Sequence, residues 1–354
     1  MNTLANVKNL KHFLSVLFTI ILIQSSVTAK QSPKGWQSPF FQDHELVGKI
    51  WDTHKDVWLT AKQLNNELLH YDYILLGEIH NNPDHHNLQA DIINFLATSN
   101  VKPSVVMEML SQKDWQKQPQ TWNKYDELLA LAGMLNDGWP WELYSPILQS
   151  VVDHQLKLFA GNISSNELHR WSNDQSTDKK TDLLFEYSYT SDNFITLKKN
   201  IINSHCGHAN QDFVNFMLRA QMQRDRIMAT SLVGKDIPVV FIAGSEHVRN
   251  DYAVPMQLRR KFKQTSYLSV AFISVVEGED DPQAYLQGDS ALYDILYFTP
   301  SHTNEDPCEK FRKQLKNMDH QQTLQGAEGR LNTCSCLQIV SYMRQCLPDI
   351  YSFI

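Results

Sequence analysis

Two apolar runs far apart in the chain end in the same pattern, and this repetition constrains the fold more than any other feature. Tyr73–Leu76 precedes Gly77-Glu78-Ile79-His80, and Ile237–Ala243 precedes Gly244-Ser245-Glu246-His247. A short, continuous apolar run is typical of a strand that is covered on both faces. Glycine permits a sharp turn at the end of such a strand. We therefore expect each histidine to lie just beyond a sheet edge.

Two further runs also end in polar residues. Ser104–Met107 is followed by Glu108, and Lys157–Ala160 is followed by Gly161-Asn162. In open α/β sheets, ligands bind outside the carboxyl ends of the strands. An alternative for Glu108 is a carboxylate stabilised by the N-terminus of a helix. If the four strands are parallel neighbours, their ends bring together Glu78, His80, Glu108, Asn162 and His247.

The first pattern continues into a turn that is rich in potential ligands. His85, His86 and Gln89 follow His80 closely, and Asp84 is expected to cap a helix that starts near His85. Burying so many polar groups without partners is costly, which favours a functional site over a surface loop with incidental histidines.

The middle of the chain is predicted to be helical. One face carries apolar residues at helical spacing, namely Phe213, Phe216, Met217, Ala220, Ile227 and Met228. The polar positions from Gln221 to Asp225 either reach the site or form a solvated face. The alternation of strands and helices predicts an α/β fold with a largely parallel central sheet flanked by helices, in a single main domain.

The N-terminus has the pattern of an export signal. Lys8 and Lys11 precede the apolar segment Phe13–Ile23, and Val27-Thr28-Ala29 supplies small residues for cleavage. The alternative is an uncleaved membrane anchor. Removal of the two lysines changes the formal charge from −7 to −9, because the segment contains no acidic residue. An acidic chain of this kind disfavours nucleic acid as a partner.

The cysteines suit an oxidising compartment. Cys308, Cys334, Cys336 and Cys346 are expected to form two disulfides, with Cys308 bonded to the Cys334/Cys336 pair or to Cys346. The alternative is a zinc site at Cys334, Cys336 and Cys346. Cys206 is then the odd cysteine, expected to be buried and inert.

Several stretches together resemble the ChaN family of haem-binding uptake proteins, within the wider Tiki/erythromycin-esterase-like superfamily. The matching stretches are Gly77–His80 with His85, His86 and Gln89, then Met107–Met109, Trp141–Ile147, His205–Gly207, Gln221–Ala229, Ala243–Pro255, Tyr297–Pro300 and Asp306–Cys308. Three departures are the lack of a lipobox cysteine after the signal segment, Ala253 where the family pattern has glycine, and Ile163-Ser164-Ser165 after Asn162 where it has a Leu-Pro-Arg run. The resemblance divides the chain into a signal peptide (1–29), a ChaN-like haem-binding domain (43–312) and a cysteine-containing extension (313–354).

The resemblance implies an exported, periplasmic or membrane-associated protein of haem or iron uptake, which binds haem non-covalently at the carboxyl rim of the sheet. The partners it implies are haem, a second copy in a homodimer, and an outer-membrane haem receptor system. Trp139 and Trp141 would contribute to an apolar slot. The candidate haem-binding residues are His80, His85, His86, Tyr144, His247, Arg249 and Tyr252.

Among these candidates, Tyr144 is the first choice of axial ligand and Tyr252 the second, because an anionic phenolate oxygen suits ferric iron. The alternative for each tyrosine is a side chain that packs in the core, with its hydroxyl bonded to the backbone. His85 or His86 would ligate the iron or bond a propionate, and Arg249 would clamp a carboxylate.

Two other functions are open at this point. The superfamily includes metal-dependent hydrolases, and a divalent metal held by Glu78, His80, Glu108 and His247 would use Glu78 or Glu108 as general base. Against an enzyme, the chain has no helical His-Glu-x-x-His pattern and no nucleophile elbow. The third possibility is a structural or partner-binding exported protein.

Overall fold

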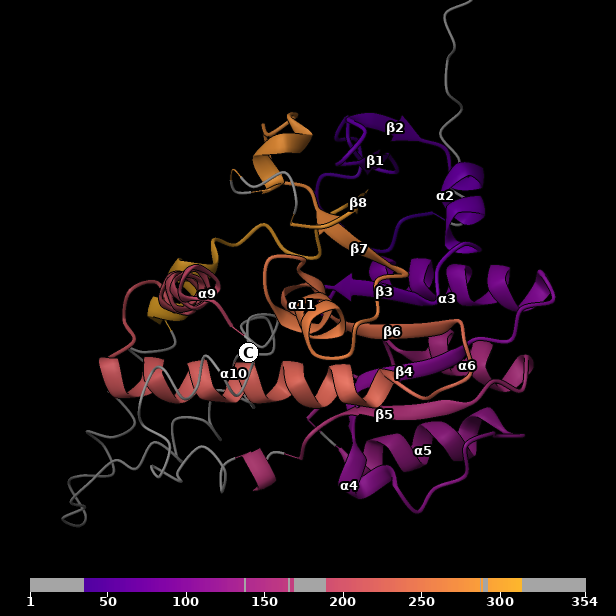
Figure 1. Ribbon diagram of the computed structural model, residues 1–354. Helices are drawn as coiled ribbons and strands as arrows, with labels where there is room; N and C mark the ends of the chain where they lie inside the picture. The colour runs from indigo at the N-terminus through magenta and orange to yellow at the C-terminus, as the bar shows by residue number, and fades with distance from the viewer. Residues whose placement is uncertain are drawn as a thin grey trace, which may run out of the picture. The chain divides into compact units, whose positions relative to one another are not determined.

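The computed structural model describes residues 35–136, 138–164, 166–168, 189–286, 288 and 292–313. From Trp36 onward these residues belong to one unit. Within it, eight strands form a sheet in the order β2-β1-β8-β7-β3-β6-β4-β5 (Figure 1). The strands are β1 (Ile50–Asp52), β2 (Val57–Leu59), β3 (Tyr73–Glu78), β4 (Ser104–Ser111), β5 (Leu158–Asn162), β6 (Val239–Gly244), β7 (Tyr267–Ser274) and β8 (Ile295–Thr299).

The predicted fold class is confirmed. The strands from β8 to β5 pair in parallel, and only β1 and β2 at one side of the sheet pair antiparallel. The four strands identified from the sequence are consecutive neighbours, β3-β6-β4-β5. In the register of β3 and β6, Gly77 lies opposite Ala243 and Glu78 opposite Gly244. The two Gly-x-x-His patterns therefore leave the sheet at the same edge.

Helices cover both faces of the sheet, which explains the continuous apolar runs in the central strands. Ile74 and Leu76 of β3 pack into a core with α3, α5 and α6, while Tyr73 and Leu75 pack on the other face with α10 and α11. The helical segments are α2 (Ala61–Leu68), α3 (Pro83–Thr98), α4 (Gln112–Trp115), α5 (Tyr125–Leu135), α6 (Ser145–Asp153), α9 (Ser191–Ser204), α10 (Gln211–Leu232), η2 (Ser245–Val248), α11 (Ala253–Arg260) and η3 (Pro282–Leu286).

Gly77 is required for close packing and not for a sharp turn. Gly77 and Gly244 both lack the positive φ that favours glycine, and Gly244 has φ −57°. A Cβ on Gly77 would lie 2.9 Å from the Cα of Ser245, closer than real Cβ contacts allow. Glycine at this position lets β3 approach η2, the short helix that carries His247.

The cap of α3 differs from the prediction. Asn82, and not Asp84, is the N-cap, and its side chain accepts a hydrogen bond from the Asp84 backbone N–H. The Asp84 carboxylate instead accepts hydrogen bonds from the backbone N–H groups of Gln37 and Ser38. Pro83 at the first helical position shifts the helix start upstream, because its fixed φ and missing N–H suit that place.

The cysteine pairing also differs from the prediction. Cys206 and Cys308 form a disulfide, so Cys206 is not the odd cysteine and Cys308 does not bond to the tail. The sequence separation of 102 residues concealed a pair that the fold brings together. Cys334, Cys336 and Cys346, together with the alternative zinc site and the signal segment 1–29, lie outside the described residues. Within the described ranges, no helix has the length and apolar character needed to cross a membrane.

Candidate functional site

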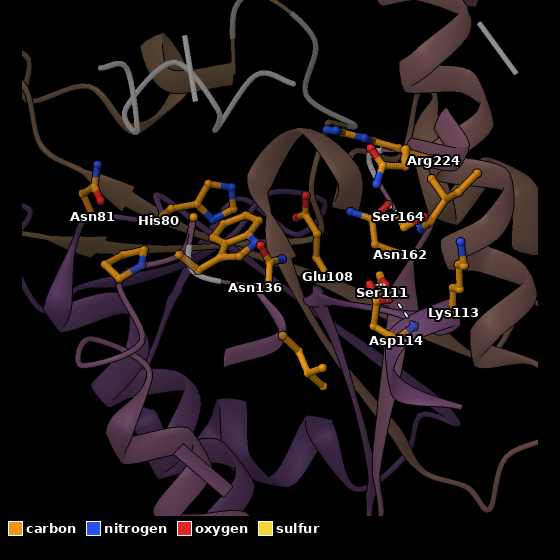
Figure 2. A pocket seen from close by; sticks show the side chains of 16 residues that line it. His80, Asn81, Glu108, Ser111, Lys113, Asp114, Asn136, Asn162, Ser164 and Arg224 are labelled. Atoms are coloured by element: carbon orange, nitrogen blue, oxygen red, sulfur yellow. Dashed lines mark hydrogen bonds between the residues drawn. The ribbon is translucent and has the colours of Figure 1, made fainter. Parts of the chain in front are cut away.

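Polar side chains from neighbouring strand ends meet at the carboxyl edge of the sheet, as predicted. His80, Glu108 and Asn162 line one cavity of about 250 Å³ (Figure 2). His247 lies behind Glu108, with its Nε2 3.4 Å from Glu108 Oε1. Glu78 reaches the same region through a hydrogen bond with His80. The shared edge is confirmed, while the roles assigned to these side chains stay predictions.

Glu78 is fully buried at the centre of the first polar cluster. Its Oε1 accepts hydrogen bonds from the Tyr144 hydroxyl at 2.6 Å and from His80 Nδ1 at 2.9 Å. Its Oε2 lies 3.2 Å from His86 Nδ1. Tyr144 comes from the loop that starts α6, so the cluster joins β3, α3 and α6.

His86 is held as a cation opposite this carboxylate. Its Nε2 donates to the His80 carbonyl at 2.9 Å, and its Nδ1 faces Gln89 Oε1 as well as Glu78. Both ring nitrogens thus face acceptors. Burial opposes protonation, but the Glu78 charge outweighs it and raises the pKa of His86. Burial also disfavours the charged form of Glu78 and alone would raise its pKa. The charge of His86 and the hydrogen bonds from His80 and His86 lower the pKa of Glu78 instead.

His80 differs from the other buried histidines of this edge. Its Nδ1 donates to Glu78, so its Nε2 carries the lone pair. Among the described residues, this buried Nε2 has no hydrogen-bond partner. The His80 ring lines the cavity (Figure 2). It meets Trp139 edge-on, with ring centroids 4.7 Å apart. His80 therefore brings a ring nitrogen that no described residue occupies to the wall of the cavity.

His85 is occupied by structural hydrogen bonds. Its Nδ1 accepts from the Ile79 backbone N–H at 2.9 Å, so its Nε2 donates to Thr299 Oγ1 at 2.9 Å. Burial, together with the charge of His86, lowers the pKa of His85 well below its usual value. The ring is neutral and fastens the turn after β3 to the end of β8.

The second cluster surrounds His247. Its Nδ1 donates to Asp225 Oδ1 at 2.6 Å, and Asp225 Oδ2 accepts from the Tyr189 hydroxyl at 3.1 Å. Glu108 lies on the Nε2 side and also accepts from the Gly244 backbone N–H at 2.8 Å. Burial opposes the charge on His247, but Glu108 and Asp225 outweigh it and raise the pKa of His247 to about 10. His247 is thus a cation between two carboxylates.

Burial raises the pKa of each of these two carboxyl groups, and the charge of His247 lowers it. Burial alone would raise the pKa of Glu108, but His247 lowers it to about 2. For Asp225 burial prevails and raises the pKa. Asp225 and Gln221 both come from the polar stretch of α10, and Gln221 Nε2 lies 3.2 Å from His247 Nδ1. The structure thus answers the question left open by the sequence, because this stretch reaches the site.

Arg249 and Tyr252 form a separate buried network. The Arg249 guanidinium donates to both carboxylate oxygens of Asp251, at 3.0 and 2.9 Å, and to Glu246 at 3.3 Å. The Tyr252 hydroxyl donates to Glu246 and accepts from Asn200 Nδ2. Neither residue is among those that line the cavity. Their assignment to haem binding stays a prediction.

The structure does not support the alternative metal site. Within the described ranges, no group of three or more His, Cys, Asp or Glu side chains is arranged to hold a metal ion. Glu78 is engaged by Tyr144, His80 and His86, and Glu108 by His247 and the backbone of Gly244. Of the four residues of the proposed set, Glu78 and His80 thus bond in one cluster, and Glu108 and His247 in another.

Sequence reasoning missed most of the cavity wall. Trp139 was expected there, but Trp141 is buried beside it and donates its indole N–H to the Asn136 carbonyl at 2.7 Å. The cavity-lining residues that were not identified include Ser111, Lys113, Asp114, Asn136 and Asn166. Arg224 also lines the cavity, and it belongs to the polar stretch of α10 for which the sequence left a place at the site open.

Fold and site together define an α/β protein with a polar, histidine-containing cavity at the carboxyl edge of a parallel sheet. Residues 64–258, more than half of the 354-residue chain, match the family model described as "Haem-binding uptake, Tiki superfamily, ChaN". The chain belongs to this family, which confirms the resemblance seen in the sequence motifs.

A solved structure supports the same fold. A structure of ChaN from Campylobacter jejuni, described as cofacial heme binding, is similar with a TM-score of 0.57 and 24% sequence identity, and the match covers 70% of this chain and 95% of that chain. An erythromycin esterase mutant, EreC in its open conformation, gives a TM-score of 0.40 and 13% identity over the same shares of the two chains. A comparison with curated proteins gives no match.

Proposed function

We propose that this protein is an exported haem-binding protein of haem or iron uptake, which holds haem reversibly and without covalent attachment at the carboxyl edge of the sheet. Membership of the haem-binding family supports the ligand. The observation that carries the proposal in this chain is at His80, which lines the cavity and whose buried Nε2 has no hydrogen-bond partner in the part of the chain that the structure describes.

His80 has the features of an axial ligand to haem iron. A neutral imidazole nitrogen is a common iron ligand, and such a histidine usually donates its other ring N–H to a carboxylate that fixes its orientation. The hydrogen bond from His80 Nδ1 to Glu78 supplies that second interaction. Trp139 beside the ring provides an aromatic wall. The residues present therefore fit a haem whose iron faces His80.

Tyr144, the first choice from the sequence, suits ligation less well. Its hydroxyl donates to Glu78 and its side chain is fully buried. Burial, and then the Glu78 charge, raise the pKa of Tyr144 well above 10, so the phenolate that iron requires is disfavoured. We infer that Tyr144 positions Glu78 and, through it, His80.

The size of the cavity bears on how haem would sit. Its volume of about 250 Å³ is below the roughly 300–1,000 Å³ typical of pockets that enclose a whole ligand. We therefore expect haem to enter by one edge and to remain partly exposed. A partly exposed haem is accessible to a second copy of the chain or to an outer-membrane receptor, the partners that the resemblance suggests.

Titration with hemin, followed by the Soret absorption, tests the proposal. Wild type should show a saturable spectrum, and His80→Ala should weaken binding about 100-fold or more, beyond the roughly 10–100-fold typical of losing an outer-shell partner. Tyr144→Phe should keep a histidine-type spectrum. His205→Gln is the matched control, because His205 Nε2 is also buried and unpartnered among the described residues but does not line the cavity.

The outcomes separate the two parts of the proposal. Absence of a saturable spectrum for wild type would refute haem binding. An unchanged spectrum for His80→Ala, with a changed one for Tyr144→Phe, would return the ligand role to tyrosine. Export is tested separately by N-terminal sequencing of the secreted or periplasmic protein, which should begin at Lys30.

A further inference from the structure

The two ring nitrogens of His80 have different surroundings. Nδ1 donates to Glu78 Oε1 at 2.9 Å, whereas Nε2 has no hydrogen-bond partner within the described ranges. His80 is 2% exposed and Glu78 is 0% exposed, so water screens the interaction between them only weakly. The proposed function gives His80 Nε2 to the haem iron. A charge on Glu78 would then act on that iron through a single imidazole ring.

The neighbours of Glu78 stabilise it as an anion. Its Oε1 accepts from the Tyr144 hydroxyl at 2.6 Å as well as from His80 Nδ1. Its Oε2 faces His86 Nδ1 at 3.2 Å. Gln89 Oε1, which can only accept, also faces this nitrogen, so His86 Nδ1 carries a proton. Three donors therefore converge on the two oxygens of Glu78, which is the environment of a carboxylate.

His86 offsets part of the charge of Glu78. Its Nε2 donates to the His80 carbonyl oxygen at 2.9 Å, so a cationic ring also lies beside His80. The His80 ring, however, bonds directly to the carboxylate and not to His86. We therefore expect the negative charge to prevail at the His80 ring, with an effect near the lower end of the roughly 10–100-fold range that outer-shell partners exert on metal sites.

We propose that Glu78 makes the cavity selective for ferric over ferrous haem. The inference rests on the proposed function, because it requires His80 as the ligand. A carboxylate that accepts the Nδ1 proton makes the imidazole more basic, and a more basic ligand favours the higher charge of ferric iron. Glu78 is thus a positioning residue that acts through His80. Tyr144 moderates this effect, because its hydroxyl donates to the same carboxylate oxygen.

The reduction potential of the haem-loaded protein tests this selectivity. Glu78→Gln keeps an oxygen that can accept from His80 Nδ1 but removes the charge. The preference for ferric over ferrous haem should fall about tenfold, which raises the potential by about 59 mV for a one-electron couple. Tyr144→Phe removes the hydroxyl that competes for Glu78 Oε1, so it should lower the potential. Glu142→Gln is the matched control, because Glu142 is exposed and does not line the cavity, and it should leave the potential unchanged.

The signs of the two shifts decide the proposal. A rise in Glu78→Gln together with a fall in Tyr144→Phe supports it, because loosened packing would move both variants in the same direction. No shift in Glu78→Gln, or a shift of the same sign in both variants, overturns it. If Glu78→Gln does not fold, a lowered potential in Tyr144→Phe supports the proposal, and an unchanged or raised one overturns it. Nitrogen-15 NMR of the ligand-free protein should place the ring proton of His80 on Nδ1, and a proton on Nε2 alone would also overturn it.

Failure of the proposed function gives different results. Wild type without a saturable hemin spectrum refutes haem binding itself. A His80→Ala protein that keeps the spectrum and the potential of wild type refutes His80 as the ligand. If wild type binds hemin through His80 but Glu78→Gln leaves the potential unchanged, the proposed function stands and the selectivity is overturned.

Discussion

Replacing Glu78 by glutamine tests the charged state of the buried site. The change keeps the shape of the side chain, so Tyr144 and His80 can still donate to its Oε1. It removes the negative charge opposite His86 and replaces Oε2, which lies 3.2 Å from His86 Nδ1, by an amide group that can only donate. Removing one member of a buried ion pair costs about 3–5 kcal/mol, because the other charge is left uncompensated.

The release of the His86 proton limits this loss. Deprotonating an ordinary histidine at pH 5.5 costs about 1.4 kcal/mol, one unit below its usual pKa. A neutral His86 that keeps its hydrogen bond from Nε2 to the His80 carbonyl has no proton on Nδ1. The hydrogen bond from Nδ1 to Gln89 Oε1 is then lost. We therefore expect Glu78→Gln to lower the free energy of unfolding by about 3 kcal/mol at pH 5.5, which corresponds to a fall in Tm of roughly 2–4 °C per kcal/mol.

The pKa shifts of Glu78 and His86 determine the pH at which the predicted loss of stability is largest. The lowered pKa of Glu78 contributes stability that is present above its ordinary value of 4.5 and is lost in acid. The raised pKa of His86 contributes stability that is complete below its ordinary value of 6.5 and declines as the pH rises. The difference between wild type and Glu78→Gln should thus be largest between these values and smaller at pH 8.5.

Urea unfolding at pH 5.5 and 8.5, followed by circular dichroism, measures both effects. Glu142→Gln makes the same chemical change on an exposed side chain and should alter stability by less than about 0.5 kcal/mol. A Glu78→Gln protein within about 1 kcal/mol of wild type at pH 5.5, or with equal losses at both pH values, would refute the ion pair.

Two further predictions follow from the same structure. The pKa of His247 is raised to about 10, so its contribution to stability is complete below pH 6.5 and is lost as the pH rises through 10. The His247 ring resonances should therefore stay constant from pH 5 to 8 in an NMR titration. A transition near pH 6.5 would contradict the ion pairs with Glu108 and Asp225. Ala253 has φ +67°, a left-handed conformation that costs alanine about 1–2 kcal/mol. Ala253→Gly should therefore change the unfolding free energy by less than about 1 kcal/mol, whereas Ala229→Gly in α10 should lower it by about 1–2 kcal/mol; equal losses in urea unfolding would disprove the strain.

The sheet could be predicted because each central strand carries its own signal. Parallel strands covered on both faces carry continuous apolar runs, and β3, β4 and β6 contain such runs without any reference to the rest of the chain. The polar residue that follows each apolar run then marks the carboxyl edge. These are local properties, and one sequence is enough to show them.

The cavity wall and the disulfide could not be predicted in the same way. Arg224 reaches the cavity because α10 crosses the sheet with its polar stretch toward the carboxyl edge, which depends on packing between distant segments. Cys206 and Cys308 come together because the end of α9 lies near the residues after β8. No spacing in the sequence encodes either of these contacts.

The two histidines of the repeated pattern show how tertiary context assigns chemistry to identical local sequence. Each follows its glycine by three residues at the same sheet edge. His80 finds its carboxylate on its own strand, and the bond to Glu78 occupies Nδ1 while Nε2 faces the cavity. His247 finds one carboxylate on α10 and another on β4, so both of its ring nitrogens face acceptors. Since only a nitrogen with a free lone pair can bind iron, the proposed function assigns the ligand role to His80, whereas His247 is a cation that compensates the charge of Glu108.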